Sequence, residues 1–348
     1  MWVFFATLIM RILFYAGYQK NKFDGDTNEG LAGTEIAIIN IAEEMVKFGY
    51  KVVVSGEVKD SGLINGVEWI STHELHEKYF DQFDYIISAS YIHFLKEFEK
   101  YSAKKVFWAH NTHHHPWWNH EVLEDANLLT QQVDHTICLT NWHKNHWAHT
   151  YNIPLNKISV IGNAIDPSTF SGTPEKVKGK FIYSSAPERG LLELLKNWPK
   201  IKTIMPHATL DIYSPGYSIA NHTDYSFNKF KEVTYHGSVD QKTLHNAMLR
   251  AEYWCYITDY EETYCITALE MQYAKVLPIV TKVAALKETV NSGVILERNE
   301  TNWNQAIQIL GTLSSGLKDK SINDAYKWSK QQTWNVRSYD WKNILESI

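Results

Sequence analysis

The chain has 348 residues, of which 44% are hydrophobic and 14% aromatic. That length exceeds what one hydrophobic core ordinarily serves, so we expect about two domains, and the apolar content excludes extensive disorder. The net charge of −5 does not indicate a nucleic-acid-binding protein. The three cysteines, Cys138, Cys255 and Cys265, lack metal-binding spacing and fit a reducing compartment, so we expect a cytoplasmic protein.

The N-terminus is apolar from Met1 to Met10 and is then interrupted by Arg11. This run falls short of the roughly 20 residues that a membrane-spanning helix needs. It also lacks the basic leader and the cleavage site of a signal peptide. We interpret it as a short extension before the first strand. The alternative is a weak, peripheral membrane association through residues 1–16.

Strands alternate with helices through the first half of the chain. A polar, glycine-rich loop follows the first strand, and a helix over 34–48 repeats apolar residues at three- and four-residue spacing. The expected strands are 12–15, 51–54, 85–88, 105–108, 135–139 and 157–161. This alternation predicts a parallel, doubly wound sheet in a first domain at 1–165.

The polar stretch from Gly162 to Gly179 is rich in Pro, Gly, Ser and Lys, and we place the interdomain linker within it, at 166–179. The strand–helix alternation then restarts and predicts a second α/β domain at 180–330, followed by a terminal segment at 331–348. The expected strands of this domain are 180–183, 209–213, 233–236, 254–257 and 277–280. Open sheets of this kind bind ligands at the carboxyl ends of their strands, so we expect a cleft between the two halves.

The most informative segment is the acidic turn between the strand at 254–258 and the helix at 266–274. Glu262 lies in this turn, and Glu270 lies roughly 7 Å into the helix. The free amides of Cys265, Ile266 and Thr267 are suited to a phosphate, and Glu270 would then reach a ribose diol. The alternative is that one carboxylate complements the helix dipole and the other faces solvent.

Three further segments follow strands and are candidate sites. Glycines before the first helix would let a ligand approach Gly33 and Thr34, although a tight turn is an equal explanation. Arg189 after the first strand of the second domain could clamp a diphosphate, or could pair at the surface with Glu188 or a neighbour. His110 begins a histidine-rich turn. We do not expect a metal site there, because adjacent histidines diverge and no carboxylate completes the set.

Together these segments resemble the GT-B glycosyltransferases, and in particular their retaining family 4. The resemblance runs from about Met10 to the end and its most specific part is similar to the family's E-x7-E signature. The matching segments are AGTE to GYKVVV (within 30–54), VIGNAID (160–166), SSAPERGL (184–191) and TDYEETYCITALEMQYA (258–274). It implies two Rossmann-like domains that face each other across a cleft, with a C-terminal helix that crosses back to the first domain.

The resemblance also implies roles for individual residues. Gly33 would approach the diphosphate of a nucleotide-sugar donor, Arg189 would neutralise it, and Glu270 would bind ribose. Glu262 and His110 would lie beside the donor sugar. The implied donor-binding residues are Gly33, Thr34, Asn163, Ser185, Arg189, Cys265, Ile266, Thr267 and Glu270, and the implied catalytic residues are Glu262, His110 and Arg189. Ser184 and Cys265 depart from the pattern, which commonly has Arg and Gly at these places.

We therefore expect a hexosyltransferase that moves a sugar from a UDP- or GDP-sugar to a glycan, lipid or protein acceptor, with retention of configuration and without a metal or other cofactor. A front-face mechanism fits better than a fixed nucleophile, because only Glu262 is an obvious candidate. Two alternatives remain: a GT-B nucleotide-sugar epimerase, and a carbohydrate- or nucleotide-binding protein without catalysis.

Overall fold

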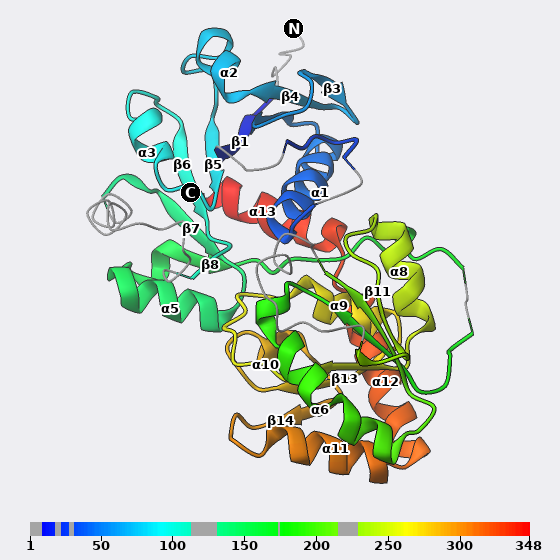
Figure 1. Cartoon of the computed structure of the whole chain (residues 1–348). Helices are drawn as coiled ribbons and strands as arrows, with labels where there is room; N and C mark the ends of the chain where they lie inside the picture. The colour runs from blue at the N-terminus through cyan, green and yellow to red at the C-terminus, as the bar shows by residue number, and fades with distance from the viewer. Residues whose placement is uncertain (1–8, 18–21, 28–30, 113–130, 173–174, 215–228) are drawn as a thin grey trace, which may run out of the picture. The chain divides into compact units, whose positions relative to one another are not determined.

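The computed structural model describes residues 9–17, 22–27, 31–112, 131–172, 175–214 and 229–348. These residues fall into two compact units (Figure 1). The first unit comprises the described residues up to 27, 31–163 and the C-terminal segment 334–348, and the second comprises 164–333. The described part of the stretch at 166–179 therefore belongs to the second unit. Within that unit, Lys176 Nζ donates hydrogen bonds to the carbonyls of Ala251 (2.6 Å) and Ala274 (2.7 Å).

The described part of the first unit contains an eight-stranded sheet with the order β3-β4-β2-β1-β5-β6-β7-β8. Its strands are β1 (Arg11–Gly17), β2 (Lys51–Gly56), β3 (Gly62–Ile64), β4 (Val67–Ser71), β5 (Tyr85–Ala89), β6 (Lys104–Trp108), β7 (His135–Cys138) and β8 (Ile158–Val160). All neighbours pair in parallel except β3 and β4. These two form a hairpin whose turn, Asn65-Gly66, has positive φ at both residues, as a type I′ turn requires. This hairpin is not among the elements predicted from the sequence.

Helices cover both faces of the first sheet. They are α1 (Gly33–Lys47), α2 (Thr72–Lys78), α3 (Phe94–Glu97), α5 (Asn141–Tyr151) and α13 (Trp334–Ser347). Side chains alternate along β1, so that Leu13 and Tyr15 pack in the cluster that α2, α3 and α5 line. Phe14, on the other face, packs edge to face against Trp341 of α13, with ring centroids 6.0 Å apart.

The C-terminal helix α13 lies beside α1 in the first unit (Figure 1). Trp341 is 1% exposed and also contacts Trp108 at a centroid distance of 4.8 Å. Tyr85 donates a hydrogen bond of 2.5 Å to the carbonyl of Leu345. The expected return of the last helix to the first domain is therefore confirmed.

The described part of the second unit contains a six-stranded parallel sheet with the order β11-β10-β9-β12-β13-β14. Its strands are β9 (Lys180–Ser184), β10 (Thr209–Tyr213), β11 (Val233–Tyr235), β12 (Tyr253–Tyr256), β13 (Leu277–Thr281) and β14 (Val294–Leu296). Its helices are α6 (Leu191–Ile204), α8 (Gln241–Arg250), α9 (Ile266–Tyr273), α10 (Leu286–Thr289), α11 (Asn302–Thr312) and α12 (Ser315–Ser329). The predicted α/β class with two doubly wound sheets is confirmed.

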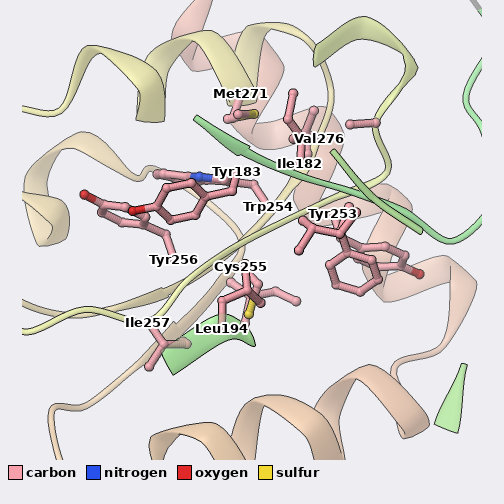
Figure 2. Packing of buried hydrophobic residues seen from close by; sticks show 14 of the residues in the cluster. Ile182, Tyr183, Leu194, Tyr253, Trp254, Cys255, Tyr256, Ile257, Met271 and Val276 are labelled. Carbon is pink, nitrogen blue, oxygen red and sulfur yellow. The ribbon is translucent and has the colours of Figure 1, made fainter. Parts of the chain in front are cut away.

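Aromatic residues fill the centre of the second unit. Trp254 and Tyr256 project from the same side of β12 and stack with ring centroids 5.0 Å apart, and Tyr183 lies beside them (Figure 2). Cys255 projects from the other side toward Leu194 of α6 (Figure 2). This alternation on a strand that is buried along its whole length explains the apolar run that the sequence shows.

No helix in the ranges that the structure describes is long and apolar enough to cross a lipid bilayer. Residues 1–8, which carry most of the apolar N-terminal run, lie outside the described residues.

Candidate functional site

The acidic turn lies at the carboxyl edge of the second sheet, next to the segment that follows β9. The strands β9 and β12 are neighbours in this sheet. Glu262 follows β12, and Arg189 ends a short 3-10 helix, Pro187–Arg189, that follows β9. The order of parallel strands therefore brings together two side chains that are 73 positions apart in the sequence.

Glu262 is 4% exposed and accepts three hydrogen bonds. Arg189 Nη1 lies 3.1 Å from Oε1 and 3.2 Å from Oε2, and the hydroxyl of Tyr256 donates to Oε1 at 2.6 Å. Burial, and after it the charge of Glu262, raise the pKa of Tyr256 well above its usual value, so the hydroxyl keeps its proton and remains a donor. Glu262 is thus fixed by one cation and one neutral donor.

Arg189 keeps hydrogen-bonding capacity after it has paired with Glu262. Burial is the largest single influence and acts to lower the pKa of Arg189, but Glu262 and the neighbouring acidic groups together outweigh it and raise the pKa above its usual value. Its Nε has no hydrogen-bond partner in the described part of the chain, and its guanidinium carbon lies 4.5 Å from the ring centroid of Tyr260. Among the described residues, Arg189 pairs with the distant Glu262 and not with Glu188, so the alternative of a local surface pair is wrong. The guanidinium retains donors for an anion.

Gly190 fixes the backbone that presents Arg189. Its φ is +113°, which L side chains rarely adopt, and a Cβ there would lie 2.9 Å from the carbonyl oxygen of Ile257. The chain after β9 therefore passes against the end of β12 only because position 190 has no side chain.

Glu270 lies in the interior of α9 and is 6% exposed. Its Oε1 is 3.1 Å from Nε2 of His245 on α8. The imidazole of His245 stacks on Phe170, with centroids 4.0 Å apart and planes 7° apart. Glu270 is therefore buried against His245 and not exposed to solvent, which excludes the solvent-facing alternative.

Neither His245 nor Tyr256 is predicted as a site residue from the sequence. A signal for His245 exists, because it lies three positions before the buried Met248 and therefore on the apolar face of α8. A polar residue on such a face needs a partner. Tyr256 carries no comparable signal, since a tyrosine in a buried strand is ordinary packing.

The start of α9 has the geometry expected of a helix N-terminus after a strand. Cys265 is its N-cap residue with φ +70°, a left-handed conformation that favours glycine. No hydrogen bond from the amides of Ile266 or Thr267 to an acceptor occurs among the described residues. Burial, and then the charge of Glu262, raise the pKa of the Cys265 thiol well above its usual value. Two backbone donors therefore lie between Glu262 and Glu270 in the chain.

Ser185 lies beside the cluster of Arg189, Glu262 and Tyr256, because its hydroxyl is 3.4 Å from that of Tyr256. The other predicted residues, Gly33, Thr34, His110 and Asn163, belong to the first unit. Gly33 and Thr34 open α1, and His110 follows β6. Burial lowers the pKa of His110 to about 3, so the imidazole is neutral near pH 7.

His113, His114 and His115 belong to the histidine-rich turn in which we do not expect a metal, and they lie outside the described residues. Within the residues that are described, no group of three or more His, Cys, Asp or Glu side chains is arranged to hold a metal ion.

Neither a protein-family model nor a curated protein sequence matches the chain. Solved structures do match over nearly its whole length. They include a glycosyltransferase from Rickettsia africae, with 16% identity, a TM-score of 0.73 and 98% of each chain covered. Anabaena HepE in complex with UDP-glucose has 14% identity and a TM-score of 0.75, and the match covers 97% of this chain and 100% of HepE. Sucrose-phosphate synthase from Thermosynechococcus elongatus has 13% identity and a TM-score of 0.75, with 97% and 98% covered. The chain therefore has the fold of the GT-B glycosyltransferases.

Proposed function

We propose that the protein is a glycosyltransferase that moves a hexosyl group from a UDP- or GDP-sugar to an acceptor hydroxyl. The observation that carries this proposal is the cluster at the carboxyl edge of the second sheet, where Arg189, the amides of Ile266 and Thr267, and the buried Glu270 occur together. A cation and helix-terminal amides suit a diphosphate, and a carboxylate further along the helix suits a ribose diol. HepE, which has the same fold, was solved with UDP-glucose, and this favours UDP as the nucleotide.

The proposed chemistry is electrostatic. Arg189 and the N-terminus of α9 would stabilise the negative charge that grows on the departing diphosphate, and Glu270 would bind the ribose. Preorganised donors of this kind contribute roughly 2.7–4 kcal/mol each to transition-state stabilisation. Because side chains and amides supply this charge, we propose a reaction without a metal.

Glu262 is the acidic residue nearest in the chain to the helix terminus, but its carboxylate is already held by Arg189 and Tyr256. A carboxylate with these partners is a poor nucleophile. This supports a front-face reaction with retention of configuration, in which Glu262 orients Arg189 and contacts the donor sugar. We keep Ser185, Cys265 and, from the first unit, Gly33, Thr34, His110 and Asn163 as proposed donor contacts.

The acceptor is proposed only by class, as a glycan, lipid or protein. A cytoplasmic location, with or without peripheral attachment to a membrane through residues 1–16, is likewise a proposal.

The decisive experiment measures the release of UDP from UDP-glucose, first with the donor alone and then with a panel of sugar, lipid and peptide acceptors. A transferase releases nucleotide slowly from the donor alone and rapidly with its acceptor. An epimerase would convert the donor without any acceptor, and a binding protein would release no nucleotide. None of the structural neighbours that we compared is described as an epimerase, so that alternative is not favoured.

Binding alone can be measured before an acceptor is known. A ligand raises apparent stability by RT ln(1 + [L]/Kd), which is about 2.7 kcal/mol at a concentration one hundred times Kd. We expect UDP and UDP-glucose to raise the melting temperature. Absence of any shift with uridine, guanosine and adenosine diphosphates would overturn the proposed function.

A further inference from the structure

His245 is a buried polar residue whose ring is fixed on two sides. One face stacks on Phe170 at 4.0 Å, and Phe170 in turn packs against Tyr273 of α9 at a centroid distance of 4.7 Å. At its edge, Nε2 contacts Oε1 of Glu270 at 3.1 Å. Because a carboxylate only accepts hydrogen bonds, Nε2 carries the hydrogen. The imidazole is thus held in one plane, with a single donor aimed at Glu270.

The other nitrogen of His245, Nδ1, is buried and has no hydrogen-bond partner among the residues that the structure describes. A purely structural histidine would ordinarily satisfy both nitrogens. Within the described ranges, the only polar contact of the ring is the one to Glu270. The ring is therefore held by its stacking on Phe170 and by its hydrogen bond to the carboxylate of Glu270.

Both side chains are buried, and that of Glu270 keeps the larger exposed fraction. The side chain of Glu270 is 9% exposed and that of His245 is 4% exposed. No hydrogen bond to Oε2 of Glu270 occurs among the described residues. The hydrogen bond from Nε2 fixes the rotation of the carboxylate about its last bond, and it leaves Oε2 and one lone pair of Oε1 as acceptors. Two acceptors in a fixed plane match the two hydroxyls of a ribose.

We propose that His245 is a positioning residue that orients the carboxylate of Glu270 toward a ribose diol and so makes the site selective for ribonucleotide over deoxyribonucleotide donors. This proposal depends on the proposed function, because Glu270 must bind ribose. His245 lies outside the E-x7-E pattern. Its proposed effect on ribose selectivity can be measured by binding, separately from any effect on folding.

The test compares the dissociation constants of UDP and 2′,3′-dideoxy-UDP by calorimetry, in the wild type and in three variants at position 245. His245→Leu removes the hydrogen-bond donor and places an apolar side chain in the buried space of the imidazole. His245→Gln carries an amide nitrogen near the place of Nε2, whereas His245→Asn carries it near Nδ1 and cannot reach Glu270. Lys242→Gln, an exposed change on the same helix, is the control for α8.

A hydrogen bond between a hydroxyl and a carboxylate favours binding by roughly tenfold or more. We expect the wild type and Lys242→Gln to bind UDP at least about tenfold tighter than the dideoxy compound. This ratio should fall several-fold in His245→Leu and His245→Asn and stay within about twofold of wild type in His245→Gln. The dissociation constant of the dideoxy compound should change little, since it lacks the diol.

The outcomes are separable. The proposal would be overturned if His245→Leu and His245→Asn kept the wild-type ratio of the two dissociation constants. It would also be overturned if these variants lost affinity for UDP and the dideoxy compound equally. A third contradicting result is a His245→Gln variant that melts at the wild-type temperature but does not keep the ratio. If the wild type binds UDP but does not discriminate, the ribose role of Glu270 fails and the proposal fails with it. If the wild type binds none of UDP, GDP and ADP, the proposed function itself is overturned.

Discussion

The ion pair between Arg189 and Glu262 allows stability and turnover to be changed independently. Arg189→Met removes the guanidinium and leaves a carboxylate that is 4% exposed, with the hydroxyl of Tyr256 as its remaining side-chain donor. Breaking a buried pair costs about 3–5 kcal/mol of unfolding free energy. The Arg189 side chain is 33% exposed, so solvent screens the pair, and we expect about 2 kcal/mol.

Glu262→Gln in the Arg189→Met background removes the uncompensated charge and keeps the bond to Tyr256. The double variant should therefore recover most of the lost stability, which urea denaturation measures as an interaction energy between the two sites. Turnover should not recover, because the departing diphosphate still lacks its cation. We expect kcat for nucleotide release to stay at least about one hundredfold below wild type in both variants.

Glu188→Gln is the matched control. Glu188 is adjacent to Arg189 and is exposed. Its substitution should change stability by less than about 0.5 kcal/mol and leave kcat unaltered. Two results would refute the reasoning: Arg189→Met with the stability of wild type, or a double variant in which turnover returns together with stability.

Three further predictions concern single positions. Tyr256→Phe removes the 2.6 Å bond to buried Glu262 and should lower the free energy of unfolding by about 1–2 kcal/mol in urea denaturation. Gly190→Ala should destabilise by about 1–3 kcal/mol and lower turnover, because a Cβ at φ +113° meets the carbonyl of Ile257. Burial lowers the pKa of Lys176 to about 7, whereas the pKa of a lysine in the unfolded chain is about 10.5. Between these two pH values the unfolded chain therefore binds more protons than the native state. The contribution of Lys176 to stability therefore increases as pH rises through this interval, and the difference in unfolding free energy between wild type and Lys176→Met should rise with it.

Each of these has a result that contradicts it. Unchanged stability in Tyr256→Phe would mean that the hydroxyl does not support Glu262 in solution. Wild-type activity in Gly190→Ala would show that the turn tolerates a side chain. A wild-type minus Lys176→Met difference that is flat between pH 7 and 10 would place the ammonium in contact with water.

The sequence predicts the strand, turn and helix around Glu262 and Glu270 well, because an apolar run followed by three- and four-residue periodicity is a local signal. It does not predict what those carboxylates contact. Arg189, Tyr256 and His245 reach them from three separate elements, and the sequence offered the adjacent Glu188 as the partner of Arg189. Pairing across a parallel sheet depends on strand order, which no local pattern encodes.

The hairpin of β3 and β4 was missed for a different reason. Its Asn65-Gly66 turn is a strong local signal, but its strands are short and alternate too briefly to stand out from a loop. The short edge strand β14, at Val294–Leu296, was missed in the same way. Elements at the edges of a sheet bury few side chains and so leave weak periodicity in the sequence.

The position of α13 in the fold has a consequence for how the protein is made. The first unit needs Trp341 to fill the space against Phe14 and Trp108, and Leu345 to accept the hydroxyl of Tyr85. Trp341 and Leu345 follow the second unit, 164–333, in the sequence, so they leave the ribosome after it. During synthesis the second unit can therefore fold before α13 has emerged, at a time when that helix does not yet cover the apolar face around Phe14.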